Sequence, residues 1–309
     1  MDKMHSSIVP LLEEVGLEVS YQPKIKRSEL IAQIEDYDGL IVRSKTNIDK
    51  EVLAQAGKLK FIGRAGAGVD KIDLQEVKRL GVQLINAPEG NRDAVAEHAM
   101  GMLLGLLNNM YQANEQVKSG IWDREGNRGI ELKGKTVGVV GYGYMGRAFA
   151  RRLSAFGCEV MAYDRYKSNY GDEYGREVSL EELHDKADIV SFHFPLTEEN
   201  RFSIDTAYLN SFKKPIFLIN TARGEILRLE DLISSLKSGK VIGAALDVLE
   251  NEKFHKLSPA QKQALDWLAK SNRVLFTPHV AGWTHESYYK LNKTLADKIR
   301  ALKLFADEK

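Results

Sequence analysis

The chain has 309 residues, of which 43% are hydrophobic and 28% are charged, and its net charge is +1. This length exceeds that of most single domains, so two domains are expected. The balance of charges gives no electrostatic reason to expect binding to nucleic acid or to a membrane surface. No apolar run approaches the ~20 residues that span a bilayer. The single cysteine, Cys158, excludes an internal disulfide and is expected to serve packing, so we predict a cytoplasmic protein.

The first eighty-odd residues alternate between helical and strand patterns. Helices are predicted over 8–15, 29–34, 50–56 and 74–80, and strands over 17–21, 39–42, 60–63 and 82–85. This alternation predicts a parallel sheet covered by helices on both faces. The chain opens almost directly on a helix, so either the sheet lacks a first strand or the natural chain begins upstream. We expect the second, because a gap in a sheet leaves neighbouring backbone groups unpaired.

Residues 93–118 form a long, strongly apolar helical pattern. A helix that is apolar on several faces packs inside its own domain and often against a second subunit. We therefore predict a homodimer built partly through this helix.

Three glycines organise the next part of the chain. Gly141, Gly143 and Gly146 follow the β-branched run 136–140 and open a helical pattern that stops at Gly157. In a dinucleotide-binding turn the first glycine allows the tight turn, the second lets the backbone approach a pyrophosphate, and the third lets the helix pack on its strand. Such a glycine pattern alone also occurs in purely structural turns.

An acidic residue strengthens the dinucleotide interpretation. Asp164 ends the next predicted strand, 159–163, at about the place where a ribose-binding carboxylate is expected. A carboxylate there accepts hydrogen bonds from the ribose hydroxyls and repels a 2′-phosphate, which favours NAD over NADP. The neighbouring Arg165 weakens that preference.

The remaining chain continues the same alternation. Strands are predicted over 188–193, 216–220, 241–246 and 274–277, with helices over 206–212, 229–236, 259–270 and from about 285. In open parallel sheets, ligands bind beyond the carboxyl ends of the strands, and polar residues follow several of these strands. Arginine there can bind a carboxylate and polarise a carbonyl, histidine can move a proton, and glutamate can orient that histidine. The residues of this kind are Arg223, Asp247, Glu252 and His279. Taken singly, Arg223 and Glu252 are better explained as solvated surface charges and His279 as a loop residue.

Taken together, these patterns identify a family. From residue 43 to residue 284 the chain resembles the D-isomer-specific 2-hydroxyacid dehydrogenases, on stretches at 40–44, 63–70, 86–88, 140–146, 193–197, 220–224, 245–248 and 277–279. The resemblance implies an α/β fold of two doubly wound parallel-sheet domains. Residues 89–277 are expected to form a Rossmann NAD-binding domain. Residues 1–88 and 278–309 are expected to form a discontinuous, flavodoxin-like substrate domain, with the active site in the cleft between the two domains.

The resemblance also implies roles for individual residues. Arg223, Glu252 and His279 would be catalytic, with Glu250 a weaker candidate because the proline that usually follows the catalytic glutamate is Lys253 here. The expected cofactor-binding residues are Gly141, Gly143, Tyr144, Met145, Gly146, Asp164, His193, Pro195, Thr197, Thr221, Ala222 and Asp247. The expected substrate-binding residues are Arg43, Ser44, Arg64, Ala65 and Gly66. No metal site is expected.

The implied activity is the NAD-dependent oxidation of 3-phospho-D-glycerate to 3-phosphohydroxypyruvate, which belongs to serine biosynthesis. Arg43 and Arg64 favour a phosphorylated substrate because two guanidinium groups can clamp a phosphate. One alternative within the family is a reductase of glyoxylate, hydroxypyruvate or another 2-keto acid. A second alternative, from another class, is an NAD-sensing binding protein similar to the corepressors that share this fold.

Overall fold

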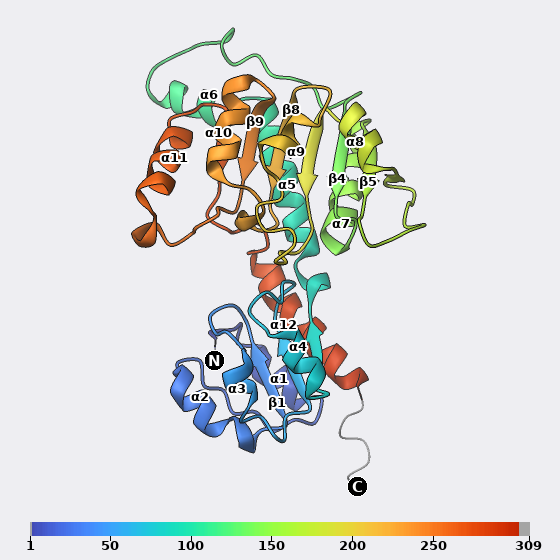
Figure 1. Cartoon of the computed structure of the whole chain (residues 1–309), viewed down its shortest axis with the longest axis vertical. Coiled ribbons are helices and arrows are strands. Elements are labelled where there is room, and N and C mark those ends of the chain that lie inside the picture. Colours follow the sequence, from blue (N-terminus) through green and yellow to red (C-terminus); the bar gives the residue numbers. More distant parts are fainter. Residues whose placement is uncertain (1, 303–309) are drawn as a thin grey trace. The chain divides into compact units, whose positions relative to one another are not determined.

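The structure is a computed structural model that describes residues 2–302, and the chain divides into two compact units. Unit 1 comprises the residues up to Arg92 and those from Trp283 onward, and unit 2 comprises Asp93–Gly282. Each unit contains a parallel sheet with helices packed against it (Figure 1), which confirms the predicted α/β class. Residues 303–309 of the predicted segment 278–309, together with Met1, lie outside the described residues.

Unit 2 is built on one parallel sheet with the order β10-β9-β8-β7-β4-β5-β6. The chain begins this sheet in the middle, at β4, fills one side with β5 and β6, and then returns beside β4 with β7 to fill the other side. The carboxyl ends of β4 and β7 therefore form the switch point at which such sheets bind ligands. The strands are β4 (Thr136–Val140), β5 (Glu159–Tyr163), β6 (Arg176–Glu177), β7 (Ile189–Phe192), β8 (Ile216–Asn220), β9 (Val241–Leu246) and β10 (Val274–Phe276).

Helices cover this sheet and bury two apolar clusters. One cluster includes Leu183, Leu209 and Leu232, and the other includes Leu103 and Phe149. Ser258 begins α11 with a capping box, and Pro259 occupies the first helical position, where its missing N–H costs nothing. The helices are α7 (Tyr144–Leu153), α8 (Leu180–Lys186), α9 (Thr206–Asn210), α10 (Leu229–Ser238) and α11 (Pro259–Ala269).

The predicted single helix over 93–118 is wrong. The structure has two helices here, α5 (Arg92–Leu107) and α6 (Met110–Lys118), separated at Asn109, which adopts the left-handed conformation with φ 51°. Asparagine tolerates this conformation because its short polar side chain interacts with the local backbone. Helix α5 is buried in the core of unit 2, whereas α6 has no buried residue. Along residues 2–302, every helix is too short or too polar to cross a membrane.

Cys158 lies between α7 and β5 and is half-buried. Its thiol donates a hydrogen bond to the carbonyl of Leu153 at 3.2 Å. Burial raises the pKa of the Cys158 thiol, and thiols in such apolar surroundings are unreactive. The residue therefore contributes packing.

Unit 1 contains a parallel sheet of order β1-β2-β3. Helix α12 returns from the far end of the chain and packs its Leu291, Leu295 and Ile299 against Phe61 of this sheet. The strands are β1 (Gly39–Val42), β2 (Phe61–Arg64) and β3 (Gln83–Asn86), and the helices are α1 (Ile8–Glu13), α2 (Arg27–Gln33), α3 (Lys50–Leu53), α4 (Leu74–Arg79) and α12 (His285–Ala301).

The predicted strand over 17–21 is absent from the structure, where this segment has no regular secondary structure and pairs with no strand. Among the described residues, β1 pairs only with β2, so its other edge faces this segment. A groove of about 850 Å³ lies between them, lined by apolar side chains that include Ile8, Leu17, Val19 and Leu40. A strand needs a neighbour to satisfy its N–H and C=O groups, and the groove separates segment 17–21 from β1.

The start of the described chain is fixed at one end of this groove. The carboxylate of Asp2 accepts hydrogen bonds from the backbone N–H groups of Arg43, Ser44 and Lys45, directly after β1. A segment that leads into Asp2 from within the groove would therefore run parallel to β1. It could pair with β1 on one side and with residues 17–21 on the other.

We expect that six residues rich in valine and isoleucine, fused ahead of Met1, fill this groove as a strand. They should raise the Tm by about 4 °C or more, because paired backbone groups and buried apolar surface together stabilise the unit. Thermal melts followed by circular dichroism would measure the effect. The matched control carries proline at alternate positions of the extension, which removes the N–H donors that a ladder needs. Equal melting of both fusions and the parent chain would contradict the interpretation of the groove.

Candidate active site

A glycine cradle lies at the switch point of unit 2. Gly141 follows β4 with φ 93°, and a Cβ there would lie 2.7 Å from the carbonyl carbon of His193 at the end of β7. A Cβ at Gly146 would lie 2.1 Å from the carbonyl oxygen of Gly141. Both positions therefore require glycine for close backbone packing. At Gly143, by contrast, an added Cβ would meet nothing within 4 Å, so the backbone borders open space where a phosphate can approach.

The surroundings of this cradle fit a dinucleotide. Gly143 is the N-cap of α7, and no side chain of the described chain caps that helix end, so its N–H groups and dipole favour an anion. The hydroxyl of Thr221, after β8, is buried and has no hydrogen-bond partner among residues 2–302. Tyr144 and Met145 form the first turn of α7. Thr221 and the backbone at Gly143 would hold a bound NAD.

His193 closes one side of the cradle. Its Nε2 lies 2.8 Å from the hydroxyl of Ser191, and its ring packs against Phe149. Burial lowers the pKa of His193 to about 3, so the imidazole is neutral at physiological pH. Pro195 and Thr197 lie in the loop that follows, and Asn200 ties this loop together by bonding to both of them.

Asp164 lies at the end of β5, as expected for a ribose-binding carboxylate. It accepts hydrogen bonds from the backbone N–H groups of Tyr142 and Tyr166, and the Lys167 ammonium lies 3.5 Å away. Arg165 forms an ion pair with Glu199. The carboxylate is thus oriented by the turn of Gly141 on one side and by its own loop on the other.

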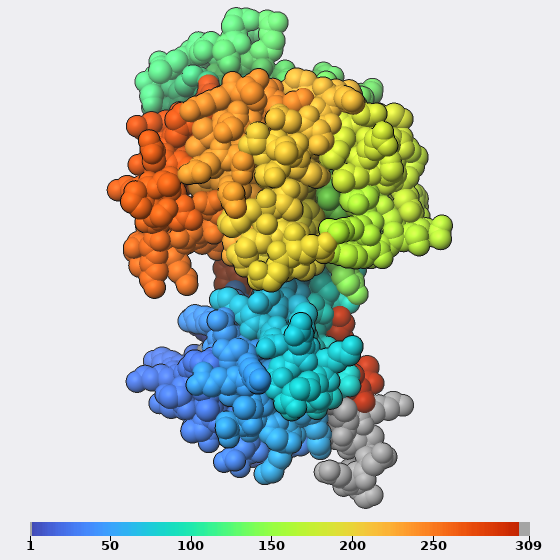
Figure 2. Space-filling view, in the orientation of Figure 1, coloured from blue at the N-terminus to red at the C-terminus, as the bar shows by residue number. Residues whose placement is uncertain are grey.

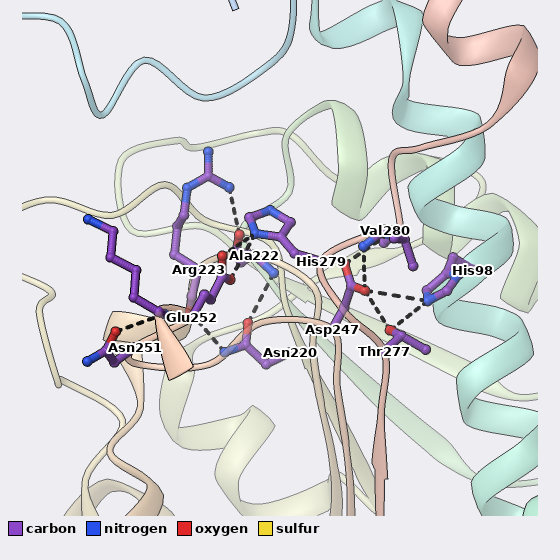
Figure 3. Close-up of polar contacts among 12 residues, drawn as sticks. His98, Asn220, Ala222, Arg223, Asp247, Asn251, Glu252, Thr277, His279 and Val280 are labelled. Carbon is purple, nitrogen blue, oxygen red and sulfur yellow. Dashed lines mark hydrogen bonds and ion pairs between the residues drawn. The ribbon is translucent and has the colours of Figure 1, made fainter. Parts of the chain in front are cut away.

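The catalytic candidates gather at the carboxyl ends of β8, β9 and β10 (Figure 3). His279 follows β10, and its Nδ1 lies 2.8 Å and 3.0 Å from the two carboxylate oxygens of Glu252. The hydrogen bond to Glu252 raises the pKa of His279, while burial and the positive charge of Arg223 lower it to a smaller extent. Nδ1 faces Glu252, so Nε2 is the ring nitrogen left to exchange a proton with a substrate.

Arg223 belongs to a loop that is shaped by Asn220. The amide of Asn220 donates to the carbonyl of Arg223 at 3.0 Å and accepts from the N–H of Ala222 at 3.0 Å. The guanidinium of Arg223 donates to the carbonyl of Ala222 at 2.7 Å. The sequence pattern gave Asn220 no role, although a buried asparagine at a strand end is a recognisable signal for such a turn.

Two further residues surround Asp247: Thr277, which lies in the stretch 277–279 but was given no role from the sequence, and His98, which was not predicted. The buried carboxylate of Asp247 lies 2.5 Å from the hydroxyl of Thr277, and Nε2 of His98, on α5, lies 2.9 Å from that hydroxyl (Figure 3). No local motif signals His98, because its partner lies far along the chain. Within residues 2–302, no group of three or more His, Cys, Asp or Glu side chains is placed to hold a metal.

Glu250, the weaker catalytic candidate, has a structural contact. Its carboxylate accepts a hydrogen bond from the N–H of Leu229 at 3.1 Å, at the start of α10. A carboxylate stabilises a helix N-terminus in that position. Glu252 and not Glu250 makes the contact with His279.

The expected substrate residues lie in unit 1, after neighbouring strands. Ser44 and Arg43 follow β1, and Arg64 ends β2, where it is in register with Val42. The guanidinium of Arg43 stacks 3.9 Å from the ring of Trp283. That of Arg64 donates to the carbonyl of Ala65 at 2.9 Å and occupies the space that a side chain at Gly66 would fill. The parallel sheet thus brings both arginines to one edge of unit 1.

Comparison with known proteins defines the class. Residues 100–281 match the family described as D-isomer specific 2-hydroxyacid dehydrogenase, NAD binding domain. The chain is 37% identical over 302 residues to D-3-phosphoglycerate dehydrogenase of Methanocaldococcus jannaschii, covering 97% of this chain and 56% of that protein. It is 35% identical to hydroxypyruvate reductase of Thermotoga maritima, covering 94% of this chain and 92% of that protein.

A solved structure agrees with this assignment. D-lactate dehydrogenase from Aquifex aeolicus, complexed with NAD and lactic acid, superposes with a TM-score of 0.81 at 28% identity, covering 96% of this chain and 92% of that one. The chain therefore belongs to the D-isomer-specific 2-hydroxyacid dehydrogenase family, and the match of unit 2 to its NAD-binding domain confirms NAD as the cofactor expected from the sequence. The chain spans about half the length of the phosphoglycerate dehydrogenases that it matches.

The Glu252–His279 pair generates a prediction about pH. If His279 is the acid and base, the rise in its pKa caused by Glu252 keeps the imidazolium that protonates a keto acid to higher pH, and the neutral form that oxidation needs appears only above that pKa. Glu252→Gln should therefore shift both pH profiles of kcat/KM to lower pH, so that keto-acid reduction fails earlier and oxidation begins earlier. Profiles for the two directions measured with both proteins would test this. Unshifted profiles would remove Glu252 from control of His279.

Proposed function

We propose that the protein oxidises 3-phospho-D-glycerate to 3-phosphohydroxypyruvate with NAD, in serine biosynthesis. The observation that carries the proposal is the hydrogen-bonded pair of His279 and Glu252 beside Arg223, at the same sheet edge as the dinucleotide cradle. We assign residues 89–277 to cofactor binding and residues 1–88 and 278–309 to substrate binding.

His279 is the acid and base of this reaction. In oxidation, its neutral Nε2 accepts the proton of the C2 hydroxyl, and Glu252 stabilises the imidazolium that results. In the reverse direction the imidazolium returns that proton to the C2 oxygen. Arg223 holds the substrate carboxylate and stabilises the developing carbonyl oxygen through its fixed fork of N–H groups. The bound NAD supplies the hydride acceptor.

The preference for a phosphorylated substrate rests on unit 1. Arg43 and Arg64 lie at the carboxyl ends of adjacent parallel strands, so two guanidinium groups lie at one edge of unit 1. Guanidinium groups bind phosphate bidentately, and the stacking of Arg43 on Trp283 limits the side-chain entropy that binding would cost. Ser44, Ala65 and Gly66 supply the neighbouring hydroxyl and backbone groups. The phosphoglycerate dehydrogenases among the relatives support the same substrate.

A second candidate function is the reduction of hydroxypyruvate or a related 2-keto acid such as glyoxylate. The observation in its favour is the relative from Thermotoga maritima, a hydroxypyruvate reductase that this chain covers over 92% of its length. An NAD-sensing binding protein remains a third candidate, which the absence of any turnover would favour.

A panel of keto acids decides among these functions. We expect NADH oxidation to be much faster with phosphohydroxypyruvate than with hydroxypyruvate or glyoxylate. Arg64→Ala should lower kcat/KM for phosphohydroxypyruvate about tenfold to a hundredfold, because a charge-assisted contact to phosphate is lost, and should change the value for hydroxypyruvate little. Lys24→Ala, a charge change elsewhere in unit 1, is the control. Equal losses on both substrates would favour the reductase.

We further propose that the protein works as a homodimer in the cytoplasm. Exposed apolar side chains gather on α6 and the following loop, which stand out from the surface of unit 2 in Figure 2 (green). They are Met110, Tyr111, Val117, Ile121, Trp122 and Ile130. A second copy of the chain suits this face, because a net charge of +1 gives little repulsion between copies. Because helix α5 is buried within unit 2, α6 and the following loop form most of the contact between the two copies.

Trp122 tests the dimer most directly, because 79% of it is exposed. Trp122→Glu should convert the dimer to a monomer in sedimentation velocity, since a charge would be buried in an apolar interface. Phe156→Glu, at an exposed apolar position elsewhere in unit 2, should leave the dimer intact. A monomeric parent protein at micromolar concentration would refute the proposal.

A further inference from the structure

The turn that carries His279 has a backbone conformation that is unusual for a residue with a side chain. His279 adopts the left-handed conformation with φ 55°. Residues other than glycine rarely adopt this conformation, although histidine, asparagine and aspartate do so more often than the rest, and it persists only where the surroundings hold it. The residues around the turn must therefore supply that restraint.

Asp247 supplies it directly. Its carboxylate accepts hydrogen bonds from the N–H groups of Val280 and Ala281, both at 2.9 Å, and its carbonyl accepts from the N–H of His279 at 2.7 Å. Three consecutive N–H groups of the turn are thus bound to one residue at the end of β9. The position of this carboxylate determines the shape of the turn.

Two residues outside the turn hold the Asp247 carboxylate in place (Figure 3). The Thr277 hydroxyl lies 2.5 Å from Asp247 Oδ1 and 2.9 Å from Nε2 of His98. A hydroxyl has one proton, which the charged carboxylate takes, so Thr277 accepts from His98. Nε2 of His98 is therefore the donor in this contact. Hydrogen bonds therefore run from α5 through Thr277 to Asp247 and then to the turn.

We propose that His98 and Thr277 are positioning residues for His279. They hold the Asp247 carboxylate where it stabilises the left-handed turn, and the turn presents the imidazole to Glu252. The assignment of His279 as the acid and base rests on the proposed function, whereas the restraint on its side chain does not. Glu252, Arg223 and Asp247 are the charged groups that act on the imidazole.

The first test follows the His279 ring in the absence of substrate. Histidine ring nitrogens are titrated by NMR, with the His279 signal assigned from its loss in His279→Gln. We expect Thr277→Val and His98→Phe to move the raised pKa of His279 toward its ordinary value, because the ring loses its alignment with Glu252. Thr277→Ser keeps the hydroxyl and should restore the parent titration. An unchanged titration in both Thr277→Val and His98→Phe would overturn the proposal.

The second test measures turnover. Thr277→Val and His98→Phe should lower kcat about tenfold to a hundredfold, since a small misplacement of a catalytic group is costly, while the KM for the keto acid changes little. Ser235→Ala is the matched control, because it removes a buried hydroxyl of unit 2 that has no hydrogen-bond partner in the described chain. Its titration, kcat and melting should equal those of the parent.

The outcomes separate this proposal from the proposed function. A parent protein without turnover on any keto acid would refute the proposed function, and the His279 titration would still decide the role of His98 and Thr277. If Thr277→Val fails to fold, His98→Phe decides alone, because His98 is partly exposed on the side of α5. A His98→Phe protein with parent kcat and parent titration would overturn the role assigned to His98.

Discussion

The burial of one carboxylate connects most of the candidate active site. An ionised carboxylate is costly to remove from water unless donors replace its hydration. Asp247 is 2% exposed, and its donors are two N–H groups of the turn after β10 and the hydroxyl of Thr277. Its own N–H donates to the carbonyl of Asn220, the residue that shapes the loop of Arg223. The hydrogen bonds that compensate for the burial of Asp247 therefore also fix the strand ends that carry Arg223 and His279.

The sequence predicted those parts of the fold that depend on local chemistry. The β-branched run at 136–140, the glycines after it and the strand at 159–163 were predicted at the residues where they occur, because each pattern is complete within a few positions. The strand at 17–21 was predicted wrongly, since strand formation depends on a neighbour that local periodicity does not reveal. The prediction of one helix over 93–118 was wrong at Asn109, where a single left-handed residue interrupts an otherwise continuous apolar pattern.

The residues of the candidate site, too, were predicted only in part from the sequence. The resemblance proposed Arg223, Glu252 and His279, and the structure brings Glu252 into contact with His279 while giving Glu250 a role at a helix terminus. The contact of His98 with Thr277 joins residues 179 positions apart. Neither residue type nor spacing indicates such a pair, because one partner is an ordinary helix residue and the other an ordinary residue at a strand end. Only the topology of the parallel sheet brings them together.

Cys158 has a practical consequence for the study of this protein in solution. Its thiol is half-buried and donates a hydrogen bond to a backbone carbonyl. Burial raises the pKa of the thiol, so little of Cys158 is present as the reactive thiolate. A cysteine introduced at an exposed site of either unit would react faster with maleimide or nitroxide reagents than the native one. Each unit can therefore carry its own spectroscopic label without removal of the native thiol.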